Sequence, residues 1–265
     1  MSAAPLLNIK GLTLRYGGLA AVEDLDLIVA EGALDALIGP NGAGKTSLFN
    51  LISGLTRQDD GEIWLGGARI DRLSPSQRAR RGLARTFQNL RLFTETTAIE
   101  NVLVGMHLHV GGSLLEILTR FGRFRQAERA AVDAARELLA FVGLSSVEYA
   151  PAGSLSYGDQ RRLEIARALA AKPKLLLLDE PAAGMNPAET AALRLLLEKL
   201  RAQKISMLLV EHDMSLVMRL CDKITVLNFG RKIAEGPPDA VRANPAVIEA
   251  YLGVKGAAHF RGDAA

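Results

Sequence analysis

The chain is poor in cysteine and has no long apolar run, and both absences exclude classes of protein. Its 265 residues include one cysteine, Cys221, so no disulfide can form within the chain, as is typical of cytosolic proteins. Cys221 is expected to be a small buried apolar side chain. No apolar stretch approaches the ~20 residues that a membrane-spanning helix needs. Membrane-embedded and disulfide-stabilised folds are therefore not indicated.

Clusters of like charge and a secretory leader are also missing. The net charge is +3 without a polybasic tract, so nucleic acid is not an expected partner. The first residues, MSAAPLLNIKG, lack a charged start followed by a long apolar segment, so a secretory signal is not expected. These absences predict a cytoplasmic protein that reaches a membrane only through partners.

What the chain does contain is a glycine-rich turn between an apolar run and a helical pattern. In LDALIGPNGAGKTSLFNLISG, Gly39, Gly44, Lys45 and Thr46 fit the pattern G-x-x-x-x-G-K-[ST]. In such a loop the backbone N–H groups surround phosphates, the lysine contacts the β- and γ-phosphates, and the hydroxyl binds Mg²⁺. The helix that follows directs its positive amino end at the same anion. The flanking patterns favour nucleotide binding over an ordinary strand–turn–helix joint.

Two acidic residues follow a second apolar run, LLLLDEP. This run is typical of a buried parallel strand, which would bring Asp179 to its carboxyl end. Asp179 is expected to hold Mg²⁺ through water. Glu180 points elsewhere and can orient or deprotonate an attacking water. The alternative is an acidic turn that merely ends a strand.

A third segment, SLSYGDQRRLEIARALA, predicts a capped helix. Ser156 can cap a helix that starts near Gly158, with Asp159 in its first turn. A serine, a glycine and free N–H groups form a second anion site. A single ATP-binding chain has no obvious need for a second anion site, unless that site serves another subunit.

The order of patterns along the chain indicates an α/β fold. Segments in 6–32 predict strands, and residues 59–70 predict a hairpin. Residues 97–150 become helical, which suggests an inserted helical subdomain. Strands and helices alternate over 174–236, which implies right-handed crossovers and a parallel sheet. One set of side chains is expected on a solvated helix face: Arg78, Arg80 and Arg81.

These motifs together resemble the nucleotide-binding subunit of an ABC transporter. The phosphate loop, the glutamine of RTFQNLRLF, the LSYGDQ signature, LLLLDEP and the histidine of LLVEHD occur in that family's order. The resemblance implies a P-loop NTPase fold with a RecA-like parallel core, an antiparallel β-subdomain and an inserted α-helical subdomain. It also implies that two subunits pack head to tail, each ATP lying between one phosphate loop and the other subunit's signature.

The resemblance also assigns roles to individual residues. Tyr16 would stack on adenine, Val22 would pack beside the base, and Gln88 would contact Mg²⁺ and the water. Glu180 would act on that water, and His212 would contact the γ-phosphate. The phosphate-binding residues would be Asn41, Gly42, Ala43, Gly44, Lys45, Thr46 and Ser47, with Ser156, Gly158 and Gln160 serving the opposite site. The Mg²⁺ ligands would be Thr46, Gln88 and Asp179.

Some positions depart from the common family pattern. Tyr157 stands where most of the superfamily has glycine, and Asn186 stands where aspartate is commoner. Both features resemble the ATPases of branched-chain amino acid importers. Asp35 sits at a strand start where an apolar residue or glycine is expected, and its role is not evident from the sequence.

The resemblance implies partners and a location. The partners would be a second ATPase subunit, identical or not, two integral membrane permeases, and a periplasmic or extracellular substrate-binding protein. The chain would lie peripherally on the cytoplasmic side of the cell membrane. An ABC ATPase domain would span 1–254, with the helical subdomain at about 90–160, and 255–265 would be a disordered tail.

Other readings of the sequence remain open. An importer of urea or short amides, or lipopolysaccharide export, would use a similar ATPase. A non-transport ABC protein is a further alternative.

Overall fold

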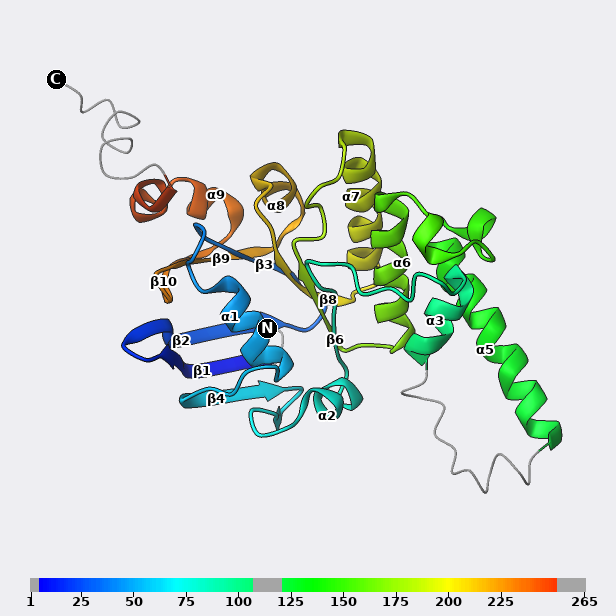
Figure 1. Ribbon diagram of the computed structural model, residues 1–265. Helices are drawn as coiled ribbons and strands as arrows, with labels where there is room; N and C mark the ends of the chain where they lie inside the picture. The colour runs from blue at the N-terminus through cyan, green and yellow to red at the C-terminus, as the bar shows by residue number, and fades with distance from the viewer. Residues whose placement is uncertain (1–4, 107–120, 252–265) are drawn as a thin grey trace.

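Two β-sheets and a set of helices form the molecule (Figure 1). The computed structural model describes residues 5–106 and 121–251, without the side chains of 121–127. The tail expected at 255–265 lies outside the described residues. Within the described residues no helix is both long enough and apolar enough to cross a membrane.

The smaller sheet is antiparallel and has the strand order β2-β1-β4-β5. Its strands are β1 (Pro5–Tyr16), β2 (Leu19–Ala30), β4 (Asp60–Leu65) and β5 (Ala68–Arg69). Strands β4 and β5 form the hairpin expected from DDGEIWLGGARI. This sheet is the antiparallel β-subdomain that the sequence predicted.

The larger sheet has the order β10-β9-β3-β8-β7-β6. Its strands are β3 (Leu34–Ile38), β6 (Leu83–Arg85), β7 (Leu175–Asp179), β8 (Ser206–Val210), β9 (Lys223–Asn228) and β10 (Arg231–Gly236). All neighbouring pairs are parallel except β9 and β10. Every residue of β3, β7 and β8 is buried, as in a sheet covered on both faces.

Helices cover both faces of the larger sheet. The α-helices are α1 (Lys45–Ser53), α2 (Pro75–Arg80), α3 (Ala98–Met106), α5 (Phe121–Phe141), α6 (Tyr157–Ala170), α7 (Pro187–Ala202), α8 (Met214–Leu220) and α9 (Pro238–Arg242). Two 3₁₀ turns, η1 (Ser145–Val147) and η2 (Ala152–Ser154), precede α6. In Figure 1, α1 lies between the two sheets, and α3, α5, α6 and α7 gather at the other end.

The larger sheet separates two apolar cores. Ala36 of β3 packs with α6 and α7 on one side, whereas Leu37 packs with α1 and the smaller sheet on the other. Phe49 of α1 is fully buried in the second core. Burying one such side chain contributes about 1.5–3 kcal/mol. Side chains of β3 therefore point alternately into the two cores. Those in the second core pack against α1, the helix that follows the phosphate loop, and hold it against the sheet.

Arg78 corrects the expectation of a solvated arginine face on α2. Its side chain is 1% exposed, whereas Arg80 and Arg81 are exposed as expected. The guanidinium donates to the carbonyls of Leu51 and Ile52, at 2.5 and 2.8 Å. The last carbonyls of a helix have no intrahelical partner, so Arg78 satisfies the end of α1.

Candidate ATP-binding and hydrolysis site

The glycine-rich loop joins β3 to α1 as the sequence predicted. A Cβ added at Gly39 would lie 2.2 Å from the Leu227 carbonyl oxygen, and one at Gly44 would lie 2.3 Å from that of Ala21. Gly44 has a φ of +102°, a conformation that glycine adopts most readily. Only glycine fits these two positions, and the backbone is therefore free to curve around a phosphate.

Lys45 lies at the amino end of α1 and is 6% exposed. Its Nζ donates to the carbonyls of Gly39 and Pro40, at 2.6 and 3.0 Å. Burial lowers the pKa of the ammonium group, and the carboxylates of Glu180 and Asp179 act in the opposite direction. The lysine is thus close enough to both carboxylates for their charges to affect it.

A cavity of about 520 Å³ opens over this loop. It is lined mainly by residues 18–21, residues 41–47, Glu180, His212 and Phe229. The phosphate loop therefore shares one cavity with Glu180 and His212, although these two residues follow different strands. This is the expected placement, because ligands of open α/β sheets bind at the carboxyl ends of the strands. Gln88, the third residue predicted as catalytic, is outside the lining.

The Glu180 carboxylate joins three separate segments of the chain. Gln88 Nε2 donates to Glu180 Oε2 at 2.8 Å, and His212 Nε2 lies 3.0 Å from Glu180 Oε1. Glu180 has a φ of +47°, which is uncommon for a residue with a side chain and costs of order 1–3 kcal/mol. The structure thus brings together the three side chains that the sequence proposed as catalytic.

Asp179 precedes Glu180 and is 4% exposed. Arg85 of β6 donates from Nη2 to Asp179 Oδ2 at 2.7 Å. The same guanidinium donates to Asn50 Oδ1 and Ser53 Oγ of α1, each at 2.8 Å. Sequence reasoning missed Arg85. The only signal was a charged residue at the end of a short strand, directly before the TFQ segment.

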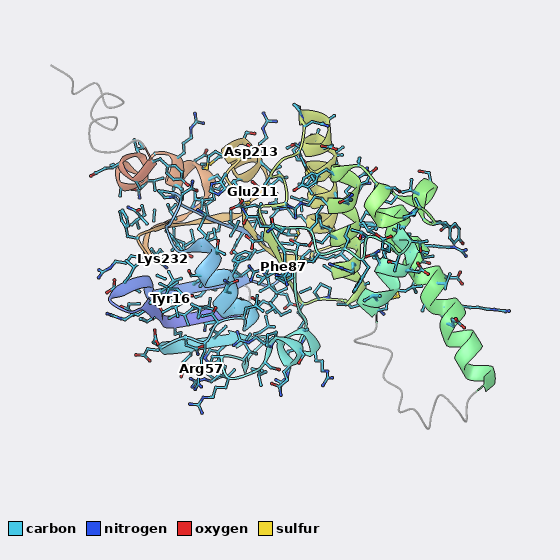
Figure 2. All side chains as sticks on the ribbon, viewed as in Figure 1. Tyr16, Arg57, Phe87, Glu211, Asp213 and Lys232 are labelled. Atoms are coloured by element: carbon cyan, nitrogen blue, oxygen red, sulfur yellow. The ribbon has the colours of Figure 1, made fainter. Side chains whose placement is uncertain are left out.

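Glu211 is a second residue that sequence reasoning missed. It follows β8 and is 4% exposed (Figure 2). Its carboxylate accepts from the backbone N–H of Ala182 at 2.7 Å and from that of His212 at 3.0 Å. Burial raises the pKa of Glu211, and these N–H groups act against the shift. Glu211 therefore links the loop after Glu180 to the backbone of His212 by hydrogen bonds.

The signature lies at the amino end of α6. Ser156 caps the helix by accepting from the Asp159 N–H at 3.1 Å, as predicted. The Gly158 N–H donates to Glu189 Oε1 of α7 at 3.2 Å, and a Cβ at Gly158 would lie 2.7 Å from the Glu189 side chain. Neither Ser156 nor Gly158 lines the cavity over the phosphate loop.

Three other predicted binding residues lie outside that cavity lining. Tyr16 is 56% exposed at the end of β1 (Figure 2), and Val22 is fully buried in the core between the sheets. Gln160 Nε2 turns back to donate to the Leu155 carbonyl at 3.0 Å. Their roles in nucleotide binding stay predictions.

The residues predicted to hold Mg²⁺ have suitable chemistry. Thr46, Gln88 and Asp179 offer a hydroxyl, an amide oxygen and a carboxylate, and oxygen ligands are those that Mg²⁺ prefers. Across the described residues, no group of three or more His, Cys, Asp and Glu side chains is arranged to hold a metal ion. Binding of Mg²⁺ by these three residues stays a prediction.

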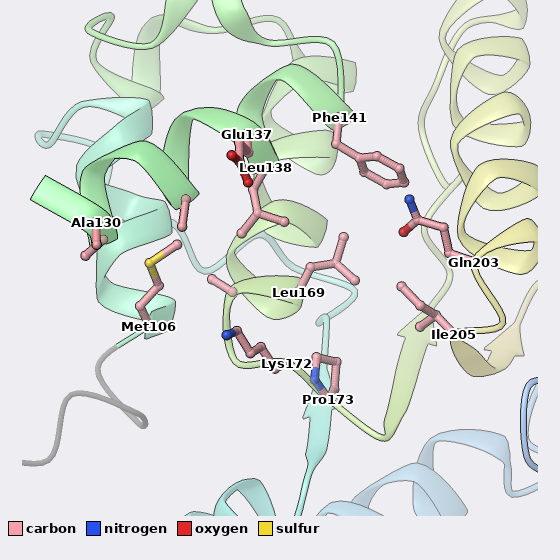
Figure 3. A pocket seen from close by; sticks show the side chains of 13 residues that line it. Met106, Ala130, Glu137, Leu138, Phe141, Leu169, Lys172, Pro173, Gln203 and Ile205 are labelled. Carbon is pink, nitrogen blue, oxygen red and sulfur yellow. The ribbon is translucent and has the colours of Figure 1, made fainter. Parts of the chain in front are cut away.

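A larger cavity of about 740 Å³ lies elsewhere (Figure 3). Its lining includes Leu138 and Phe141 of α5 and Leu169 of α6. Pro173 lies two residues before β7 and Ile205 directly before β8, at the amino ends of the strands. The phosphate loop lies at the opposite, carboxyl end of the sheet, so this cavity is separate from the nucleotide site.

Family models match both the core and the end of the chain. The ABC transporter model matches residues 22–183, which contain the phosphate loop, the signature and Glu180. The chain therefore belongs to the ABC transporter family and is an ABC transporter ATPase. A model described as "Branched-chain amino acid ATP-binding cassette transporter" matches residues 231–257. The chain groups with the ATP-binding proteins of that branch.

Curated relatives match over nearly the whole length. The high-affinity branched-chain amino acid transport ATP-binding protein BraF of Pseudomonas aeruginosa is 48% identical, covering 94% of this chain and 98% of BraF. The corresponding protein LivG of Escherichia coli is 46% identical, with the same two coverages.

Solved structures share the fold. A nucleotide-free ATP-binding cassette from an ABC transporter superposes with a TM-score of 0.81 at 31% identity, covering 94% of this chain and 99% of that chain. An ATP-binding cassette in its ADP conformation also gives 0.81, at 30% identity, covering 95% and 100%. The predicted ABC ATPase fold is confirmed.

Proposed function

We propose that this chain powers the import of branched-chain amino acids by hydrolysing ATP. The cargo rests on the names of the relatives and on the match of residues 231–257. The chemistry rests on one observation, the convergence of Gln88 and His212 on the two carboxylate oxygens of Glu180 beside the phosphate loop.

In the proposed reaction, Glu180 accepts a proton from water while the water oxygen attacks the γ-phosphorus. ADP leaves, and inorganic phosphate is the second product. Gln88 orients the water, and His212 stabilises the charge that develops on the γ-phosphate. Lys45 and the backbone N–H groups of 41–47 bind the phosphates.

Thr46, Gln88 and Asp179 would hold the Mg²⁺ ion. The ion would neutralise charge on the β- and γ-phosphate oxygens. Arg85 keeps Asp179 in place through its contact with Oδ2.

The proposed working unit is a head-to-tail pair of ATPase subunits. Ser156, Gly158 and Gln160 would bind the γ-phosphate held by the partner, and Tyr16 and Val22 would flank adenine. Two arguments support the pair: the signature lies outside the cavity of its own chain, and a bacterial ABC cassette 25% identical to this chain is dimeric.

The remaining parts of the proposal concern the assembly. Two integral membrane permeases and a periplasmic or extracellular substrate-binding protein would complete the transporter, with this chain peripheral on the cytoplasmic face. The chain would act as one ABC ATPase domain over residues 1–254, with its helical subdomain at about 90–160.

The test of the chemistry is Glu180→Gln in the purified chain with its partner subunits. Losing the carboxylate removes the proton acceptor, so kcat should fall by about 10²–10⁴-fold while ATP affinity is retained. Glu198→Gln, at an exposed carboxylate of α7, is the control and should keep the parent rate. A Glu180→Gln complex that turns over ATP at the parent rate would exclude the assignment.

A further inference from the structure

Tyr157 is the signature residue that the proposed chemistry leaves unexplained. It lies between Ser156 and Gly158, where most of the superfamily has glycine, and is the first residue of α6. Its hydroxyl accepts from Arg161 Nη2 at 2.8 Å. The guanidinium carbon of Arg161 also lies 5.3 Å from the centre of the Tyr157 ring. The tyrosine is thus attached to the next turn of its helix by two contacts.

Arg161 extends this contact to the segment that carries Gln88. Its Nη1 donates to the Phe87 carbonyl at 2.6 Å, and its Nη2 donates to the Gln88 carbonyl. The Arg161 side chain is only 2% exposed. Charge-assisted hydrogen bonds in such a dry environment are strong, so a shift of Arg161 moves the backbone at Gln88 with it.

Glu164 completes the attachment of α6 to this backbone. It accepts from the Phe87 N–H at 3.2 Å and from Arg161 Nη1 at 3.2 Å. Its side chain is also 2% exposed. Both the N–H and the C=O of Phe87, whose position is labelled in Figure 2, are therefore held by side chains of the signature helix.

The Tyr157 ring lies beside a third segment, the loop after Glu180. A Cβ placed on Gly184 would lie 3.5 Å from the ring. Tyr157 therefore lies between the signature, the Gln88 segment and the loop that leads from Glu180 to α7. A glycine at position 157 would have no side chain with which to contact Arg161 or to occupy this position.

We propose that Tyr157 and Arg161 are positioning residues that relay occupancy of the signature to Gln88 of the same chain. In the head-to-tail pair of the proposed function, on which this inference rests, the signature serves the partner's ATP. Gln88 serves the chain's own ATP. The relay Tyr157–Arg161–Gln88 therefore couples the two ATP sites of the pair, and binding at one site adjusts the group that orients water at the other.

The experiment measures amide hydrogen exchange in the complex purified through a tag on this chain. The ligand is an ATP analogue with nitrogen bridging the β- and γ-phosphates. In the parent complex we expect the analogue to protect 41–47, 156–160 and 87–93. With Tyr157→Phe, which removes only the hydroxyl, protection should persist at 41–47 and 156–160 and be lost at 87–93. Arg161→Lys should give the same pattern.

Tyr149→Phe is the matched control. The Tyr149 hydroxyl also accepts from an arginine, Arg136 Nη2 at 2.6 Å, but Tyr149 lies in the turn before α6 and is 62% exposed. This variant should keep all three protected regions. As a second readout, the Hill coefficient for ATP hydrolysis should fall toward one in Tyr157→Phe and stay at the parent value in Tyr149→Phe.

The outcomes separate this relay from the proposed function. If 156–160 is protected but Tyr157→Phe and Arg161→Lys keep the protection of 87–93, the relay is wrong and the head-to-tail pair stands. If the analogue never protects 156–160 in the parent complex, the pair itself is wrong and the relay fails with it. Tyr157→Phe decides the case even if Arg161→Lys does not fold.

Discussion

At the scale of single residues, the buried carboxylate of Asp35 should make the stability of the fold depend on pH. Asp35 is 3% exposed, and its Oδ2 lies 3.5 Å from Lys223 Nζ. Burial raises its pKa from 3.8 to about 6, with Lys223 acting against the shift. The folded chain thus binds this proton more tightly than the unfolded chain, and stability is lost as pH rises through about 6.

Asp35→Asn should therefore stabilise the protein above pH 6 by at most about 3 kcal/mol, because one pKa unit is about 1.4 kcal/mol. At about pH 3, below the unfolded pKa of 3.8, the two proteins should unfold nearly alike, since Asp35 is then mostly neutral in both states. Thermal unfolding at both pH values measures the difference. Asp133→Asn, at an exposed carboxylate, is the control and should show no such dependence. An equal difference at both pH values would contradict the assignment.

Single residues also show which parts of the site a sequence can predict. Lys45 begins α1 and Ser156 caps α6, as the local spacing predicted, because both positions depend on neighbours close along the chain. Their roles in binding ATP stay predictions. Arg85 and its partner Asp179 are 94 positions apart, and Arg78 satisfies carbonyls of a helix 26–27 positions away. These contacts exist only because β6 pairs with β7 and α2 packs against α1, and no local sequence pattern predicts such packing.

At the scale of elements, Arg85 links β6 to both α1 and β7. Its guanidinium contacts Asn50 and Ser53 of α1 and Asp179 of β7, and it lies 5.1 Å from the centre of the Phe87 ring. Removing one partner of a buried ion pair leaves the other charge uncompensated, at a cost of about 3–5 kcal/mol.

Arg85→Met should therefore lower the free energy of unfolding by about 3 kcal/mol, and Arg85→Lys by less, because lysine keeps the charge. Urea denaturation measures the change. Arg80→Met, at an exposed arginine of α2, should stay within about 0.5 kcal/mol of the parent. Equal stability of Arg85→Met and the parent would mean that this contact does not hold the elements together.

The elements themselves were largely predictable. The leucine stripe of α7, Leu193, Leu196, Leu197 and Leu200, is buried as its spacing indicated. Gly54 ends α1 in the left-handed conformation, as its position after a helical pattern indicated. Helical spacing places Ala135, Leu138 and Leu139 on one face of α5, and this face is only partly buried. Ala135 and Leu139 pack in the core, whereas Leu138 lines the larger cavity, because periodicity defines a face but not what covers it.

At the scale of the whole molecule, the open question is what the ATPase moves. We expect the chain, tagged and extracted gently from native membranes, to co-purify with a related second ATPase and two different permeases. In the proposed transporter, other subunits select the cargo, so the composition of the complex is the informative measurement. Mass spectrometry of the purified complex identifies the subunits.

Two other compositions would contradict the proposed cargo. Exporter-type membrane subunits with a bridge protein would indicate a homodimeric lipid exporter, and the ATP chemistry would still stand. Recovery with ribosomes or the nucleoid would indicate a non-transport ABC protein. If the importer subunits are found, the complex can be reconstituted in vesicles and its rates of leucine and urea transport compared. The faster transport identifies which of the two import cargoes is correct.

The position of the signature has a kinetic consequence for the cell. Ser156 and Gly158 lie outside the cavity of their own chain. In the proposed pair, each subunit therefore supplies only part of each ATP site, and a single subunit in dilute solution has no complete site. Turnover per subunit should then rise with subunit concentration. Free subunits would have to meet by diffusion. Permeases that hold two such subunits side by side would instead keep them at a high effective concentration. ATP would then be consumed at assembled transporters and spared in the surrounding cytoplasm.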